Sequence, residues 1–353
     1  MMTEAESLLG LTAEELSGEL QRMGEPRYRA KQICAWLYAE PVRSFTEMAN
    51  LPEALRKGLA ERFKFEVPAS AVQVSADGTR KYRLTLEDGE VIECVWIPEA
   101  ARKTLCVSSQ VGCALNCQFC VTGAVGYQRN LTAGEIVAQI RHVMLMEKLP
   151  VTNLVFMGMG EPLLNVENVV QAIRVLTRKE GFGFGKRKIT VSTAGVVPQI
   201  ESFVKATGVK LAISLTGATD ASRNHWMPIN KKYSLESLSK ALRRMKLGKG
   251  RKITFEVVLM GGENDTEEEA RNLSKYLSGI PAKVNLIPYN ENPFFPRLKR
   301  PKPENVDRFR KILLLKRIQT MVRKNRGTDI MGACGQLAGR SVEPEVLRRM
   351  QHA

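Results

Sequence analysis

The chain has 353 residues, of which 44% are hydrophobic and 25% are charged, and its 53 Lys and Arg against 37 Asp and Glu give a formal net charge of +16. This composition is typical of a folded globular protein and excludes disorder as the main state. The length allows one large domain with a smaller appendage. The positive charge favours a polyanionic partner, and RNA, DNA and an anionic membrane surface all fit.

The N-terminal segment does not resemble a signal peptide, because residues 1–6 are acidic and lack a basic stretch and an apolar stretch. The longest run without a charge or histidine, residues 104–128, contains several polar side chains and is a poor candidate for a membrane span. We therefore expect a cytoplasmic protein without a membrane partner. In that compartment the seven cysteines are expected to be thiols, metal ligands or catalytic groups rather than a disulfide framework.

Residues 1–98 are predicted to form a small helical accessory domain followed by a β-meander. Thr12 and Glu15 have the spacing of a helix capping box. Further helices are expected over residues 27–38 and 51–62, and short strands over residues 71–75, 81–86 and 91–97. Asp77-Gly78 and Asp88-Gly89 separate these strands and are typical of hairpin turns.

From residue 104 the pattern alternates between strands and helices. The expected strands are 105–108, 153–157, 188–192, 210–215, 253–259 and 284–287. The expected helices are 132–147, 166–178, 197–206, 234–245, 266–277 and 304–317. Six βα units indicate a parallel sheet and are fewer than a closed eight-stranded barrel needs. The fold class is therefore α/β, with a partial (βα)6 barrel over residues 99–340, chemistry at the carboxyl ends of its strands, and a C-terminal tail at 341–353.

Much of the positive charge lies near the C-terminus. Residues 297–326 contain twelve Lys and Arg against two acids, Glu304 and Asp307. This concentration favours a face of the C-terminal region that meets phosphates. A solvated basic helix without a partner is the alternative.

Three cysteines within eight residues, Cys113, Cys117 and Cys120, have the spacing Cys-x3-Cys-x2-Cys. Soft thiolate ligands at this density suit an iron–sulfur cluster. Three ligands leave one iron of a [4Fe–4S] cube open to a substrate, whereas a structural zinc site needs four protein ligands. The arrangement therefore favours a cluster that takes part in chemistry.

This triplet after the first strand of a βα series, with Phe119 before the last cysteine, resembles the radical S-adenosylmethionine (SAM) superfamily. The resemblance implies that the open iron of the cluster binds SAM. It also implies that an electron from the cluster cleaves SAM to methionine and a 5′-deoxyadenosyl radical.

Other strand ends carry residues similar to the SAM-binding elements of that superfamily. Gly160 and Glu161 follow the second strand in a Gly-Glu-Pro element, which on its own is equally an ordinary turn. The remaining candidates for SAM binding follow the third, fourth and sixth strands: Ser192, Ser214, Leu215, Thr216 and Asn290. Polar groups are expected at the mouth of a βα fold.

Segments 105–113 (LCVSSQVGC) and 333–339 (ACGQLAG) strongly resemble the RlmN/Cfr family of RNA methyltransferases, and the similarity extends along nearly the whole chain. The resemblance implies methylation of C2 of an adenosine in 23S rRNA and in tRNA, with two SAM per turnover. Cys334 would carry the methyl group as S-methylcysteine and form a covalent adduct with RNA. Cys106 would release the product through a transient disulfide with Cys334, and Glu93 would be the proton acceptor.

Each of these residues also has a simpler interpretation. Cys106 fits a small buried strand residue, Glu93 an acid on a meander strand, and Cys334 an unengaged thiol. Thr216-Gly217 departs from the family pattern, in which His-Ala or Asn-Ala more often follows Ser-Leu. The contact that Thr216 makes is therefore open.

Three other functions are compatible with parts of the sequence. The first is a Cfr-like enzyme that methylates adenine C8 with the same residues. The second is an activase that generates a glycyl radical on a partner protein, and the third is an RNA-binding protein with a structural metal. We further expect an electron donor such as flavodoxin, and a monomer.

Overall fold

The computed structural model describes residues 6–248 and 250–339, so the predicted tail at 341–353 lies outside the described residues. The central feature is a ten-stranded sheet in the order β14-β13-β12-β11-β10-β9-β6-β5-β4-β3. Its first seven strands in that order are parallel neighbours, and the other three are antiparallel.

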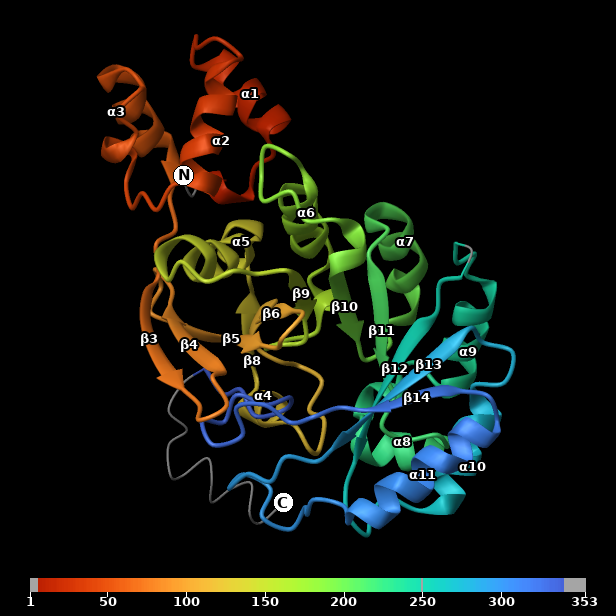
Figure 1. The fold of residues 1–353 in the computed structure, drawn as a ribbon. Coiled ribbons are helices and arrows are strands. Elements are labelled where there is room, and N and C mark those ends of the chain that lie inside the picture. The colour runs from red at the N-terminus through yellow and green to blue at the C-terminus, as the bar shows by residue number, and fades with distance from the viewer. Residues whose placement is uncertain (1–5, 249, 340–353) are drawn as a thin grey trace.

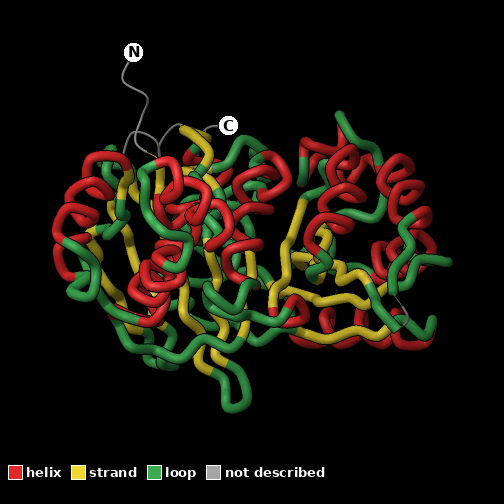
Figure 2. The backbone as a smooth tube through the Cα atoms, turned by 90° about the horizontal axis from the view of Figure 1, so that it is seen from above, coloured by secondary structure: helices red, strands yellow, loops and turns green. Residues whose placement is uncertain are grey.

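The parallel part confirms the predicted partial barrel. Its strands are β6 (Lys103–Val107), β9 (Asn153–Phe156), β10 (Ile189–Thr193), β11 (Lys210–Ser214), β12 (Ile253–Leu259), β13 (Ala282–Pro288) and β14 (Gln319–Val322). The main helices between them are α5 (Ala133–Arg141), α6 (Val166–Thr177), α7 (Val197–Thr207), α9 (Leu235–Arg244), α10 (Glu267–Tyr276) and α11 (Pro303–Leu315). Seen from above, most helices lie at the periphery and the strands run inside (Figure 2).

The structure adds elements that the sequence pattern did not predict. β14 is a seventh parallel strand. It has only four residues, stands among basic residues and is mostly exposed, so its sequence lacks the continuous apolar stretch that indicates a buried strand. A short helix, α8 (Asp220–Trp226), follows β11. The helix expected over 132–147 ends at Arg141 and continues as a π-helical segment, His142–Met146.

The meander continues the barrel sheet. β3 (Ala69–Val74), β4 (Arg80–Thr85) and β5 (Val91–Pro98) are antiparallel, and β5 pairs with β6. The domain boundary that we expect after residue 98 stays a prediction, because this pairing does not decide whether the two parts fold separately.

The accessory helices α1 (Ala13–Arg22), α2 (Arg29–Ala39) and α3 (Glu53–Arg62) lie together at one end of the molecule, far from α10 and α11 (Figure 1). The capping box at Thr12 and Glu15 is confirmed. Arg141 at the end of α5 joins these helices to the barrel. Its buried guanidinium donates to the carbonyls of Leu37, Glu40 and Val42.

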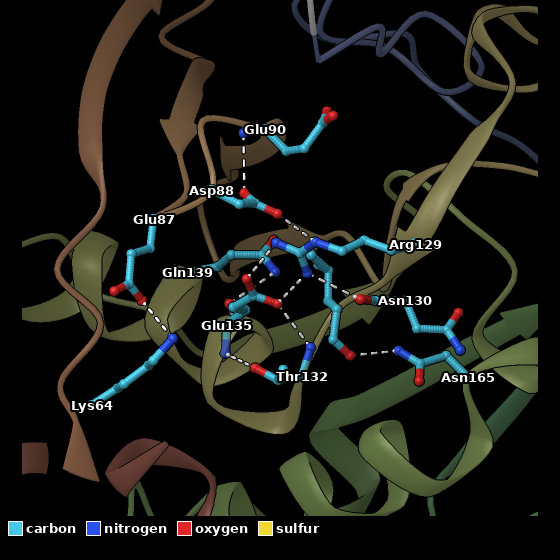
Figure 3. Close-up of polar contacts among 11 residues, drawn as sticks. Lys64, Glu87, Asp88, Glu90, Arg129, Asn130, Thr132, Glu135, Gln139 and Asn165 are labelled. Carbon is cyan, nitrogen blue, oxygen red and sulfur yellow. Dashed lines mark hydrogen bonds and ion pairs between the residues drawn. The ribbon is translucent and has the colours of Figure 1, made fainter. Parts of the chain in front are cut away.

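A two-stranded ribbon brackets the cysteine triplet. β7 (Gln110–Gly112) precedes it and pairs with β8 (Tyr127–Asn130), which follows it. Arg129 on β8 pairs with Asp88 at 2.6 Å, in the meander turn, and with Glu135 at 2.7 Å, in α5 (Figure 3). Both ends of the cysteine loop are thereby tied to the meander and the barrel.

One continuous apolar core lies beneath these elements, and the inner strands supply fully buried side chains such as Leu154, Val191, Phe255 and Val284. Within residues 6–248 and 250–339, no helix is long and apolar enough to cross a membrane.

Arg141→Leu should destabilise the attachment of the accessory helices. The substitution leaves the buried carbonyls of Leu37 and Val42, and the partly buried carbonyl of Glu40, without their donor, and each buried unpaired group costs about 1–3 kcal/mol. We expect a loss of this order in the free energy of unfolding, measured by denaturant titration. Arg43→Leu, at a nearby exposed position, should change it by less than about 0.5 kcal/mol. Equal stabilities of the two variants would contradict the structural role of Arg141.

Candidate active site

A cavity with an empty volume of about 960 Å³ lies at the carboxyl ends of the parallel strands. Its size falls in the range of ligand pockets. The walls come from the cysteine loop, the strand ends and the C-terminal segment. The predicted site residues that line it are Cys113, Cys117, Cys120, Gly160, Glu161, Ser192, Ser214, Thr216, Asn290 and Cys334. Leu215, Cys106 and Glu93 do not line it.

The cysteine loop is closed at its base by a tight backbone contact. The Cys113 N–H donates to the Gly126 carbonyl at 2.9 Å. A Cβ at Gly112 would lie 1.8 Å from the Gly126 oxygen, and Gly112 has a φ of +75°. Only glycine fits there, so the chain crosses itself immediately before the first cysteine of the triplet.

The donor set fits an iron–sulfur cluster. Burial, and then the neighbouring thiols Cys120 and Cys113, raise the pKa of Cys117 well above its ordinary value. Such thiols stay protonated unless a positively charged centre takes them as thiolates. No three His, Cys, Asp or Glu side chains within the described residues converge to hold a single metal ion. The three soft thiol donors of the Cys-x3-Cys-x2-Cys loop suit a polynuclear cluster, whose thiolates bind separate irons.

Polar side chains from adjacent strand ends meet in the cavity. The hydroxyls of Ser192 and Ser214 lie 3.2 Å apart. Asn290 donates to the Cys334 carbonyl at 3.4 Å, which links the sixth parallel strand end to the C-terminal segment. Leu215 is fully buried in the core, so its side chain does not reach a ligand in the cavity.

Gly217 packs closely against α8. A Cβ at Gly217 would lie 2.6 Å from the backbone nitrogen of Arg223 in that helix, so a larger residue would force the chain to shift. Thr216 has a φ of +48°, and its hydroxyl accepts from the Val258 N–H at 3.4 Å.

The Gly-Glu-Pro element lines the cavity and also packs closely against neighbouring parts of the chain. A Cβ at Gly160 would lie 2.5 Å from the Gln110 side chain. Both carboxylate oxygens of Glu161 accept backbone hydrogen bonds, from Leu163 at 3.0 Å and Ala194 at 2.7 Å. The close approach that requires glycine is thus an approach to β7, and the Glu161 side chain ties the second strand end to the third.

The segment that carries Cys334 docks on the cysteine loop. The Val121 N–H donates to the Gly335 carbonyl at 2.8 Å, and the Thr122 hydroxyl donates to the Leu337 carbonyl at 2.6 Å. Both donors belong to α4 (Val121–Val125), which begins directly after Cys120. The Cys334 side chain is solvent-exposed and faces the cavity. This docking brings a thiol from near the C-terminus to the cysteine triplet.

Cys106 lies behind Cys334. It is buried on β6, and burial, followed by the charge of Cys334, raises its pKa to about 12. Arg323 interacts electrostatically with both thiols. The two cysteines are close enough to interact electrostatically, and both are free thiols in this structure.

Glu93 lies beside the C-terminal segment, outside the cavity. Its carboxylate is buried, pairs with Lys81 at 3.2 Å, and accepts from the Ala338 N–H at 2.9 Å. In this conformation the predicted proton acceptor holds the segment that carries Cys334.

Glu256 and Arg323 also belong to the site, although neither is among the residues expected from the sequence. Glu256 lines the cavity, accepts from the Asn285 amide at 2.9 Å, and has one buried oxygen without a hydrogen-bond partner among the described residues. The Arg323 guanidinium lies 3.9 Å from that oxygen. Glu256 had a signal in the sequence, because it is the one charged residue within the apolar strand Ile253–Leu259. Arg323 had none, since it stands among many basic residues.

The sequence matches two family models, the ribosomal RNA large subunit methyltransferase N-terminal domain over residues 6–65 and the radical SAM superfamily over residues 107–273. A dual-specificity RNA methyltransferase RlmN from Anaeromyxobacter dehalogenans is 47% identical over 97% of this chain and 94% of that protein. The RlmN of Geobacter sulfurreducens is 47% identical over 94% of this chain and 91% of that protein. The crystal structure of a radical SAM methyltransferase from Sphaerobacter thermophilus matches with a TM-score of 0.91 and 42% identity, covering 95% of this chain and 100% of that one.

Cys117→Ala should abolish cluster binding, because two thiolates cannot replace three around the cube. After anaerobic reconstitution we expect loss of the visible absorbance of the cluster and of most bound iron. Cys34→Ala removes a buried thiol from α2, away from the cavity, and should keep both signals. Full iron content in Cys117→Ala would remove this residue from the ligand set.

Proposed function

The chain belongs to the RlmN family of radical SAM RNA methyltransferases, and we propose that it methylates C2 of an adenosine in 23S rRNA and in tRNA. Its cofactors are a [4Fe–4S] cluster and SAM. One observation carries the proposal: the exposed thiol of Cys334 lines the same cavity as the cysteine triplet and has the buried Cys106 as its neighbour. A methyltransferase that only held SAM beside its substrate would need neither thiol.

The chemistry of the target explains the carrier cysteine. Adenine C2 is electron-poor and attacks an electrophilic methyl group poorly, so a radical route is required. When bound, the cluster and SAM supply the methyl group and the radical chemistry. Cys334 accepts the methyl group on its sulfur and holds that carbon at the adenine ring, which produces a covalent adduct between Cys334 and RNA.

Cys106 then releases the product. Its thiolate attacks the sulfur of Cys334, an S–S bond forms, and the bond between that sulfur and the carrier carbon breaks. The electron pair of the broken bond stays with the carbon, which takes up a proton and becomes the methyl group. Because burial raises the pKa of Cys106 to about 12, its thiol must lose a proton before it can attack.

Glu93 takes the proton from the adenine ring before release. Its carboxylate is held by Lys81 and by the Ala338 N–H. We infer that the segment 334–338 moves when RNA binds, which breaks the contact at Ala338 and leaves Glu93 able to accept a proton. The same contact would hold Cys334 in place between turnovers.

The remaining assignments follow the family. Gly160, Glu161, Ser192, Ser214, Leu215, Thr216 and Asn290 are proposed to contact SAM, with the Leu215 contact made through its backbone, since its side chain is buried. Cys113, Cys117 and Cys120 are proposed to bind the cluster. Flavodoxin as electron donor, a monomeric state and a cytoplasmic location complete the proposal.

Product analysis tests the reaction. Reconstituted enzyme, SAM and a reductant are incubated with unmodified tRNA and with an rRNA fragment, and the digested RNA is analysed by chromatography and mass spectrometry. We expect 2-methyladenosine. 8-Methyladenosine would instead identify the C8 reaction of a Cfr-like enzyme. Cleavage of SAM without any methylated adenosine would overturn the substrate assignment.

Cys106→Ala should trap the covalent intermediate, because no second thiol attacks Cys334. We expect a protein–RNA adduct that survives denaturing electrophoresis and little free product. Cys334→Ala serves as the matched control and should form neither the adduct nor the product, while its iron content stays normal. Free product from Cys106→Ala at the wild-type rate would contradict the resolving role.

A further inference from the structure

Cations gather at the edge of the parallel sheet opposite the cavity. Strands β6 and β9 to β13 all begin at this edge, because they are parallel and pair near their first residues. Basic residues stand within two positions of the first residue of five of these strands. Lys210 and the four cations that act on it electrostatically form a group, here called the basic rim, which consists of Arg102, Arg187, Lys188, Lys210 and Lys283.

The rim residues are close enough to influence one another. Burial, and then the charges of Lys283, Lys188, Arg102 and Arg187, lower the pKa of Lys210. Further cations flank it: a Cβ at Gly208 would lie 3.7 Å from the Lys186 ammonium, and Arg251 donates to the Gly208 carbonyl at 2.9 Å. Such a concentration of like charge costs free energy unless an anion is present.

The rim is less neutralised than the C-terminal region. Within the described chain, Arg102 pairs with Glu99, but no acid pairs with Arg187, Lys188, Lys210 or Lys283. By contrast, acidic partners are found for five of the twelve cations in residues 297–326: Lys299, Arg308, Lys311, Arg323 and Arg326. The C-terminal phosphate face that we expect from the sequence stays a prediction, and in the rim a smaller fraction of the cations has an acidic partner among the described residues.

The shape of the rim favours a long anion over a small one. From β6 to β13 the sheet order gives five strand spacings, which corresponds to about 24 Å along the edge. A nucleic acid strand rises about 3.4 Å per phosphate in a duplex, so the rim can follow several consecutive phosphates. A single phosphate ion would contact only a fraction of it.

The rim is also continuous with the accessory helices. The loop between α6 and β10, which carries Arg187 and Lys188, lies beside α2 (Figure 1). Phe182 in that loop contacts Tyr38 with ring centroids 5.3 Å apart. Arg178 at the start of the loop pairs with Glu14 of α1 at 3.8 Å. A backbone that touches the accessory helices can therefore continue onto the rim.

We propose that the basic rim is a second RNA-contact surface, which binds the phosphate backbone of the substrate at a distance from the target adenosine. This inference rests on the proposed function, since it requires a large folded RNA. The rim anchors RNA without reading its sequence, because lysine and arginine contacts to phosphates are independent of the base.

Lys188→Gln/Lys210→Gln/Lys283→Gln tests the proposal. Binding of reconstituted enzyme to fluorescent unmodified tRNA, and to an rRNA fragment with the target adenosine, is measured by anisotropy between about 50 and 200 mM salt. We expect affinity to fall about tenfold for both RNAs, and the slope of log K against log salt to become shallower by about 2 to 3, or roughly 1 per lost phosphate contact. SAM cleavage without RNA should match the wild type, which verifies folding.

The matched control removes the same charge elsewhere. Lys57, Lys240 and Arg271 each pair with a glutamate one helical turn earlier, at 2.8 Å for Lys57 and 2.5 Å for the other two. Lys57→Gln/Lys240→Gln/Arg271→Gln should therefore leave the salt slope within about 0.5 of the wild type, since paired cations release few counterions from RNA.

Two outcomes overturn the proposal. If both triple variants lost the same affinity for RNA, the loss would be an effect of net charge and not of the rim. Unchanged RNA binding, with slower reduction of the rim variant by flavodoxin, would assign the rim to an acidic protein. A failure of the proposed function would be distinguishable, because the wild-type enzyme would then produce no 2-methyladenosine even at saturating RNA.

Discussion

The docking of the C-terminal segment on the cysteine loop is the interaction on which the site depends. Hydrogen bonds from Val121 and Thr122 to Gly335 and Leu337 join parts of the chain more than two hundred residues apart. Without them Cys334 would have no fixed position relative to the cysteine triplet. The same segment contacts Glu93 through Ala338. One short stretch of backbone therefore connects the proposed cluster ligands, the methyl carrier and the proton acceptor, so a movement of that stretch would change all three together.

Buried polar side chains give the cavity its shape. Arg223 is fully buried and donates to the carbonyls of Ala194, Ser214 and Leu215. Burial lowers its pKa to about 10, which still leaves it charged at neutral pH. Glu161 spans the ends of two strands in a similar way. These contacts satisfy carbonyls and N–H groups where the strands end, and they fix the walls before any ligand binds.

The two edges of the parallel sheet have different physical characters. The carboxyl edge holds thiols, hydroxyls and amides around a cavity, whereas the amino edge carries the cations of the basic rim. In the proposed function a large RNA uses both edges, with its target base in the cavity and its phosphates over the basic rim. In this proposal the chemistry and the electrostatic anchoring of RNA lie at opposite edges of the same sheet.

The sequence by itself determined the family, the six βα units and the cysteine triplet, because these depend on local spacing and on motifs that fold in place. It also predicted Ser192, Ser214 and Asn290 at strand ends, since parallel strands bring their carboxyl ends to one edge. Only the tertiary structure decided that the buried Cys106 lies within electrostatic reach of Cys334, that Glu93 holds the C-terminal segment, and that Arg323 belongs to the site. Those facts arise from contacts between distant segments, and a one-dimensional pattern carries no information about which distant segments pack together.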